Sequence, residues 1–233
     1  MPEYLTNSQF WKDKWESVDQ QEWDDGSLHF VPEWHRILRS TLQEYNGGSC
    51  LEVGCFPGRY LNYFARTYDM SVEGVDLMRP SEECNLHINC CDFFEFKSDS
   101  KFDVVCSFGF IEHFEDFADV IRHHIDLAND NGVVVITVPN FVHGWRYRSR
   151  RKLDQELFVH HNKRAMDITC LRNALKEVNV KDCKVLPLRF SYKEFGQVSG
   201  LKRIAGKILA NLSRLIPVVD RGLSTEILIV IKK

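Results

Sequence analysis

A strand that ends in a glycine loop and continues as a helix is the feature that most constrains this sequence. The apolar run 50–53 predicts a buried strand, which stops at Gly54. Pro57 and Gly58 then predict a tight turn, after which residues 60–65 have helical spacing. Without a side chain at Gly54 a ligand can approach the backbone, and the start of the helix offers free N–H groups. The unit therefore predicts a ligand site in an α/β fold.

The spacing of the glycines narrows the choice of ligand. A dinucleotide fingerprint would need glycine where Phe56 and Arg59 stand, and the chain has no phosphate-binding P-loop. Glu52, Gly54 and Gly58 instead resemble the first motif of class I S-adenosylmethionine-dependent methyltransferases, with Phe56 in place of the middle glycine. An ordinary strand-to-helix turn of a doubly wound sheet is the alternative.

Two further strand ends carry acids in the order that this family uses. Asp76 ends the predicted strand 70–76, where a carboxylate can accept ribose hydroxyls of either NAD or S-adenosylmethionine. Asp92 follows the strand 86–90, and class I methyltransferases have an acid there beside the adenine. Either acid could instead cap a turn. The resemblance implies S-adenosyl-L-methionine as cofactor, bound by Glu52, Gly54, Gly58, Asp76, Asp92, Phe93 and Ser107.

The alternation of strands and helices predicts a mostly parallel sheet with right-handed crossovers. We expect an α/β, doubly wound, Rossmann-like sheet of seven strands, and the resemblance implies the order 3-2-1-4-5-7-6 with an antiparallel last strand. The remaining strands are predicted at 102–106, 133–138, 183–190 and 225–231, and helices at 112–127 and 163–178.

The segment after the fourth strand, 107–114, resembles small-molecule O-methyltransferases related to those of ubiquinone pathways, which have Leu-Glu-His there. Those enzymes are thought to use two acids and the histidine for a divalent metal. The first acid corresponds to Gly109, which leaves Glu112 and His113, so we expect no metal. His113 is the predicted catalytic base for an acceptor hydroxyl, and packing at the start of the helix is its alternative role.

Positive charge is concentrated on the predicted acceptor side. Residues 143–164 carry seven Lys or Arg and two acids in a chain of net charge −3. Residues 138–140 and 157–166 resemble bacterial methyltransferases of cell-surface polysaccharide pathways. We therefore expect a lipid- or nucleotide-linked, anionic sugar-containing acceptor, with a solvated charged loop as the alternative. The predicted substrate-binding residues are His143, Arg146, Arg148, Arg150, His160 and His161.

The chain is expected to comprise an aromatic-rich N-terminal helical cap, 1–46, and a methyltransferase domain, 47–233, with acceptor-side insertions near 141–165 and 190–222. Helices that only pack on the sheet are the alternative for residues 1–46. An amphipathic helix is predicted at 199–216. Its apolar face could pack on the domain, form a homodimer or make peripheral contact with a membrane.

Composition excludes several classes of protein. A pI near 6.3 argues against a nucleic-acid binder. The eight cysteines lack paired C-x-x-C spacing and read as small buried hydrophobes, and no apolar run is long enough for a membrane span, so a cytoplasmic protein is expected. The predicted activity is methyl transfer to a hydroxyl. An NAD-dependent oxidoreductase and a non-catalytic S-adenosylmethionine-binding partner protein are the alternatives.

Overall fold

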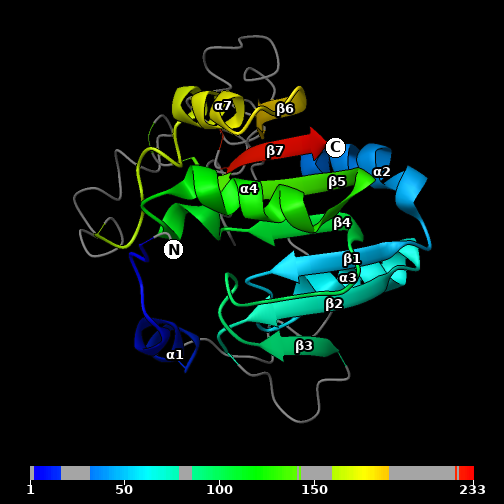
Figure 1. The fold of residues 1–233 in the computed structure, drawn as a ribbon, viewed down its shortest axis with the longest axis horizontal. Helices are drawn as coiled ribbons and strands as arrows, with labels where there is room; N and C mark the ends of the chain where they lie inside the picture. Colours follow the sequence, from blue (N-terminus) through cyan, green and yellow to red (C-terminus); the bar gives the residue numbers. More distant parts are fainter. Residues whose placement is uncertain are drawn as a thin grey trace, which may run out of the picture.

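A computed structural model describes residues 3–16, 32–78, 86–140, 142, 159–188, 224 and 226–233. Within these ranges the chain forms a seven-stranded sheet with the order β3-β2-β1-β4-β5-β7-β6 (Figure 1). The pairs from β3 across to β5 are parallel, and β7 runs antiparallel to both β5 and β6. The fold class, strand order and antiparallel last strand expected from the sequence are confirmed.

The described elements follow one another as an α/β alternation. The strands are β1 (Ser49–Val53), β2 (Ser71–Asp76), β3 (His87–Cys90), β4 (Phe102–Phe108), β5 (Ala128–Pro139), β6 (Asp182–Pro187) and β7 (Glu226–Lys232). The helices are α1 (Ser8–Glu16), α2 (Pro32–Leu42), α3 (Arg59–Tyr68), α4 (Phe117–Leu127) and α7 (Ile168–Glu177), with 3-10 turns η2 (Gln43–Tyr45) and η3 (Ile111–His113).

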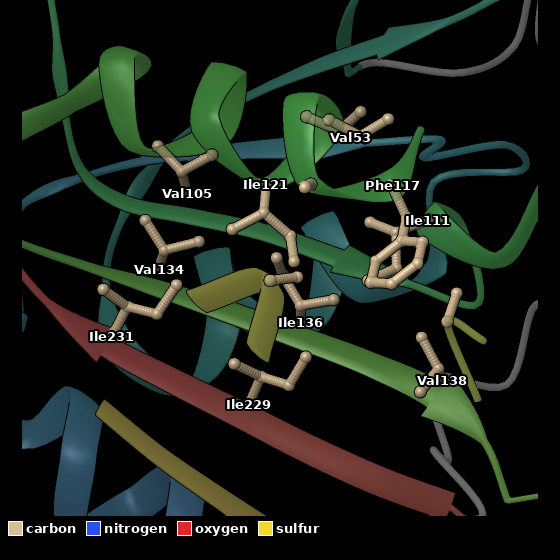
Figure 2. Packing of buried hydrophobic residues seen from close by; sticks show 14 of the residues in the cluster. Val53, Val105, Ile111, Phe117, Ile121, Val134, Ile136, Val138, Ile229 and Ile231 are labelled. Carbon is tan, nitrogen blue, oxygen red and sulfur yellow. The ribbon is translucent and has the colours of Figure 1, made fainter. Parts of the chain in front are cut away.

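Helices cover both faces of the sheet because its central strands are apolar on both sides. Successive strand side chains point to opposite faces. Val105 and Val134 belong to a buried cluster with α4 and α7, and Figure 2 shows Ile121 of α4 beside them. The neighbouring Val104 and Val133 belong to a second cluster with α2 and α3. Burying each such aliphatic side chain stabilises the fold by roughly 1.5–3 kcal/mol.

Part of the segment predicted as an N-terminal cap packs directly on this sheet. Trp34, Leu38 and Leu42 of α2 are fully buried in the second cluster with residues of β1, β4 and β5. Their spacing is that of one helical face. No helix in the described part of the chain combines the length and apolar character that a membrane span requires.

The helix predicted at 112–127 is two elements. η3 ends at His113, the backbone is extended at Phe114, and α4 begins after Asp116. The Asp116 carboxylate accepts a hydrogen bond from the Asp119 N–H, which caps α4. Phe114 instead forms an antiparallel bridge with Tyr4, a partner 110 residues earlier in the sequence that local periodicity does not reveal.

Two other boundaries also differ from the sequence prediction. α7 begins at Ile168 rather than 163, because the Asp167 carboxylate accepts from the N–H groups of Thr169 and Cys170. β5 begins at Ala128 rather than 133, and its pairing with β4 shifts register between Phe102 and Val104. Residues 128–132, which precede the predicted strand, therefore belong to β5.

The prediction that the cysteines are small buried hydrophobes is confirmed for some of them. Seven cysteines lie in the described ranges, and all are free thiols. Cys50, Cys55 and Cys106 are buried, as small hydrophobes would be, whereas Cys90 is exposed.

Candidate active site

A cavity of about 260 Å³ lies at the carboxyl ends of β1, β2 and β4. β1 has β2 on one side and β4 on the other, so the chain reverses its winding direction there. Open α/β sheets bind ligands at the carboxyl ends of their strands, at such a switch point. The N-terminal segment supplies a further wall through Tyr4, Trp11 and Trp15. This cavity is the candidate active site.

The glycine loop brings its backbone against the cavity. Gly54 has a φ of +69°, and a Cβ at this position would lie 2.6 Å from Cδ2 of Phe110. The loop is tied to β2 because the Gly54 N–H donates to the Val75 carbonyl over 2.9 Å. Gly58, with a φ of +97°, precedes α3 and does not line the cavity. Only glycine adopts such angles freely, so both positions shape the turn.

Glu52 presents a buried carboxyl to the cavity. The residue is 1% exposed, and its Oε2 has no hydrogen-bond partner among the described residues. Burial raises the pKa of this carboxyl well above its usual range because the charged form loses hydration. A cationic group of a ligand would favour the charged form and supply the missing partner. Glu52 can therefore bind an ammonium group.

Asp76 lies at the end of β2, also in the cavity wall. Its Oδ2 accepts from the Phe56 N–H at 2.9 Å and its Oδ1 from the Met78 N–H at 2.8 Å. Burial raises the pKa of the Asp76 carboxyl, and these backbone hydrogen bonds act in the opposite direction. The carboxylate is thus held in a fixed orientation with lone pairs left for ligand hydroxyls.

The other predicted cofactor residues are placed differently. Phe93 lines the cavity, but Asp92 does not. Both carboxyl oxygens of Asp92 lie 2.6 Å from the hydroxyl of Tyr4, and one also accepts from the Phe94 N–H. Ser107 is fully buried outside the cavity wall, and its Oγ has no partner among the described residues. Four of the seven predicted residues therefore border the cavity: Glu52, Gly54, Asp76 and Phe93.

His113 borders the cavity from η3. Its Nδ1 lies 2.8 Å from the carbonyl oxygen of His160. A carbonyl only accepts, so Nδ1 carries the proton in this contact and Nε2 of the neutral ring keeps a lone pair. Burial, together with the nearby His161, lowers the pKa of His113 to about 3. The imidazole is therefore neutral at physiological pH.

The two predicted histidines of the 160–166 segment lie behind His113 and do not line the cavity. The ring of His161 has its centroid 4.6 Å from that of His113. The Nδ1 of His160 lies 3.1 Å from the Leu5 carbonyl oxygen, and its ring packs on Phe10 at 4.4 Å. Asn162 fixes this segment by donating to the carbonyls of residues 114 and 115.

The N-terminal segment supplies residues that the sequence analysis did not assign to the site. The Leu5 N–H donates to the His113 carbonyl, and the Glu115 N–H donates to the Glu3 carbonyl. This short pairing positions the aromatic side chains of α1 over the cavity, where Trp11 packs against His113 and Trp15 against Phe56. The aromatic content of residues 1–46 was the available signal.

The basic residues predicted to bind substrate, His143, Arg146, Arg148 and Arg150, lie outside the described residues, as does the predicted helix 199–216.

Comparisons with known proteins agree with the strand-end geometry. A family model described as a methyltransferase domain matches residues 27–184, more than half of the chain. The chain belongs to this family. Sphingolipid C9-methyltransferase 1 of Gibberella zeae is 25% identical in an alignment over 144 residues, and the match covers 54% of this chain and 26% of that protein. The chain thus spans about a quarter of the length of this curated relative.

Solved methyltransferases share the fold at low sequence identity. An S-adenosylmethionine-dependent methyltransferase from Archaeoglobus fulgidus is 16% identical with a TM-score of 0.61, covering 97% of this chain and 100% of that one. Phosphoethanolamine N-methyltransferase 2 of Haemonchus contortus, bound to S-adenosyl-L-methionine, is 17% identical with a TM-score of 0.66. The match covers 98% of this chain and 59% of that chain. The match to the methyltransferase-domain family is consistent with S-adenosylmethionine as the cofactor, the molecule bound in the Haemonchus contortus structure.

Proposed function

We propose that the chain transfers a methyl group from S-adenosylmethionine to a hydroxyl of a small, anionic, sugar-containing acceptor. The observation that carries the proposal is one cavity with two chemically distinct ends. Glu52 and Asp76 lie at the end bordered by β1 and β2, and His113 lies at the end bordered by η3. Membership in the methyltransferase-domain family supports methyl transfer as the reaction of this cavity.

The cofactor end matches the polar groups of an adenosyl sulfonium. Glu52 would accept from the ammonium group of the methionine moiety, which satisfies its buried oxygen. Asp76 would accept from the ribose hydroxyls, since two backbone N–H groups already orient it. Phe93 would lie against the adenine. In this proposal Asp92 acts through Tyr4, which lines the cavity, rather than by direct contact.

Methyl transfer requires mainly that the protein position the acceptor oxygen against the methyl carbon. The methyl carbon of the sulfonium is already activated, so the acceptor oxygen forms a bond to it as the carbon–sulfur bond breaks and S-adenosylhomocysteine leaves. The acceptor hydroxyl must also lose its proton. His113 is our proposed catalytic residue because its imidazole borders the acceptor end and, with Nδ1 engaged by the His160 carbonyl, keeps a lone pair on Nε2.

Two features support the proposed acceptor class. Aromatic side chains such as Trp11 and Trp15 offer flat faces on which the C–H face of a sugar ring can pack. Residues 143–164 carry seven basic and two acidic side chains directly after the β5 region, and this charge would attract an anion. The named relatives and neighbours act on a sphingolipid and phosphoethanolamine, so the fold itself does not select the acceptor.

The test is a methyl-transfer screen of matched anionic and neutral hydroxyl acceptors, read out by release of S-adenosylhomocysteine. We expect turnover with anionic acceptors that weakens with added salt and in the double variant Arg148→Ala/Arg150→Ala. A preference for neutral acceptors would reject the acceptor class and leave methyl transfer intact. Cofactor binding without turnover on any acceptor would favour a non-catalytic partner protein.

A further inference from the structure

Behind the acceptor end of the cavity, three side chains from two distant segments gather their polar atoms. Glu112, His113 and His161 each offer one ligand atom, and these atoms all lie within 4.8 Å of one another. Glu112 is 1% exposed, His113 4% and His161 9%. A carboxylate and two imidazoles at such spacing form a donor set typical of a zinc-type site. Such clusters also occur without metal, and two further features of this one point to a bound cation.

The histidine of η3 is prepared as a metal ligand. Its Nδ1 is engaged with the His160 carbonyl at 2.8 Å, which fixes the ring orientation and leaves the Nε2 lone pair. Metal-binding histidines almost always donate their second ring N–H to a carbonyl or carboxylate in this way, because that bond fixes the tautomer. His160 therefore contributes its backbone carbonyl as an orienting contact rather than its ring.

The glutamate supplies an independent sign of a missing cation. One oxygen of Glu112, Oε2, is buried and has no hydrogen-bond partner among the described residues. A buried carboxylate oxygen without a partner is costly, and a bound cation would satisfy it. Lys14 is a nearby cation whose charge acts on both Glu112 and His113, and its ammonium lies 5.2 Å from the centre of the Trp11 ring.

His161 supplies the third donor where a second carboxylate is missing. Gly109, with a φ of +71°, bears no side chain, and a Cβ there would lie 3.3 Å from Glu112 Oε1. Our expectation of a metal-free site counted only residues close in sequence, and His161 is 48 positions beyond His113. The Asn162 N–H donates to the Glu112 carbonyl over 2.6 Å, which holds the two segments together.

We propose that Glu112, His113 and His161 bind one divalent transition-metal ion directly behind the acceptor end of the cavity, which His113 borders. The two imidazoles favour Zn²⁺, Co²⁺ or a similar ion over Mg²⁺, which prefers oxygen ligands. Ligands of one zinc ion at about 2.0–2.2 Å lie no more than about 4.4 Å apart, so the side chains close by a few tenths of an ångström on binding.

Three protein ligands leave one coordination position of a tetrahedral site open. This inference rests on the proposed function for its use. A divalent cation supplies Lewis acidity, which lowers the pKa of a bound hydroxyl and lets the proton leave to solvent at neutral pH. His113 then serves the reaction as a ligand that orients the acceptor end, and the neutral imidazole need not take up the proton itself.

The experiment measures metal binding directly on the full chain. Protein freed of metal with a chelator is titrated with Co²⁺ and followed by visible absorption, then by competition with Zn²⁺. We expect one equivalent to bind with the intense visible bands of a four-coordinate site and without thiolate-to-metal absorption. Glu112→Gln and His161→Asn should each weaken binding at least about a hundredfold, since even the loss of outer-shell partners costs up to that much.

Two control variants bracket these results. His87→Ala removes a histidine whose side chain is 72% exposed, and it should bind Co²⁺ as wild type does. Lys14→Ala removes a competing positive charge and should bind at least as tightly. Each variant is checked for S-adenosylmethionine binding, which reports an intact fold and cofactor end.

Three outcomes would overturn the proposal: no stoichiometric binding by folded wild type, equal binding by His161→Asn, or a thiolate spectrum that reports cysteine ligands. Failure of the proposed function looks different, because it would appear as loss of S-adenosylmethionine binding by wild type. Methyl transfer that is unaffected by chelation, in a protein that binds no Co²⁺, would leave His113 acting alone.

Discussion

The two ends of the cavity are assembled in contrasting ways. The cofactor end comes from consecutive strand ends, and its acids are oriented by nearby backbone groups, as Asp76 is by the N–H groups of Phe56 and Met78. The acceptor end joins residues 3–5, 113–115 and 160–162 through a few long-range hydrogen bonds. The cofactor end forms with the sheet itself, whereas the acceptor end forms only when segments far apart in sequence pack together. Substitutions should therefore affect cofactor binding and turnover separately.

The largest expected effect falls on turnover at the acceptor end. His113→Ala removes the imidazole that borders the cavity at the acceptor end, and it should lower kcat by roughly 10²–10⁴-fold. The dissociation constant for S-adenosylmethionine should stay nearly unchanged, because the cofactor end is independent. Steady-state kinetics and calorimetry on wild type, His113→Ala and the exposed control His87→Ala measure both values. A kcat equal to that of wild type would return His113 to a packing role.

A second effect concerns His124, which packs behind both ends against Phe93 and Phe110. Burial lowers the pKa of His124 to about 4, below the ordinary histidine value of 6.5. As the pH falls, His124 takes up its proton in the unfolded chain before it does so in the folded chain. The free energy of unfolding is therefore unaffected by His124 well above pH 6.5 and decreases as the pH drops towards 4. The loss should reach about 3 kcal/mol.

Other groups titrate over the same range, so His124 is isolated by difference. Urea unfolding of wild type and His124→Leu between pH 7.5 and 4.5 gives two curves of unfolding free energy. The wild-type curve should fall more steeply. Parallel curves would show that His124 has the same pKa in the folded and unfolded chain.

A third effect belongs to the cofactor end alone. Asp76→Ala removes a charged acceptor of hydrogen bonds, typically worth about 1.5–3 kcal/mol, so S-adenosylmethionine should bind roughly tenfold to a hundredfold more weakly. Asp92→Ala is the matched comparison because this carboxylate lies outside the cavity wall, bound to Tyr4. Calorimetry should show the smaller loss for Asp92→Ala. An equal or larger loss there would place Asp92 in direct contact with the cofactor.

The smallest effect concerns the docking of the N-terminal segment. Tyr4→Phe keeps the ring that packs on Phe114 and removes the hydroxyl that donates to Asp92. Unfolding free energy should fall by about 1–3 kcal/mol. Amide hydrogen exchange should accelerate in residues 3–16 and not in β1 or β2. Unchanged exchange in the N-terminal segment would mean that this hydrogen bond does not hold it.

The contrast also explains how far the sequence could be interpreted. The motif around Gly54 and the acid Asp76 predicted the central sheet and a cavity at its strand ends, because both depend on residues near each strand end. Tyr4 could not be recognised from the sequence, since its contacts with Asp92 and Phe114 join positions about 90 and 110 residues away. For the same reason the sequence does not reveal His161 as a neighbour of Glu112, so local spacing predicts too few ligands for a metal.

The central claim is that the cavity binds S-adenosylmethionine through the buried carboxyl of Glu52. Calorimetric titration of wild type and Glu52→Gln with S-adenosylmethionine, and of wild type with NAD, tests it most directly. We expect stoichiometric binding of S-adenosylmethionine by wild type and at least about tenfold weaker binding by Glu52→Gln. We expect no binding of NAD by wild type. Binding of NAD in place of S-adenosylmethionine, or equal affinity of the two proteins for S-adenosylmethionine, would contradict it.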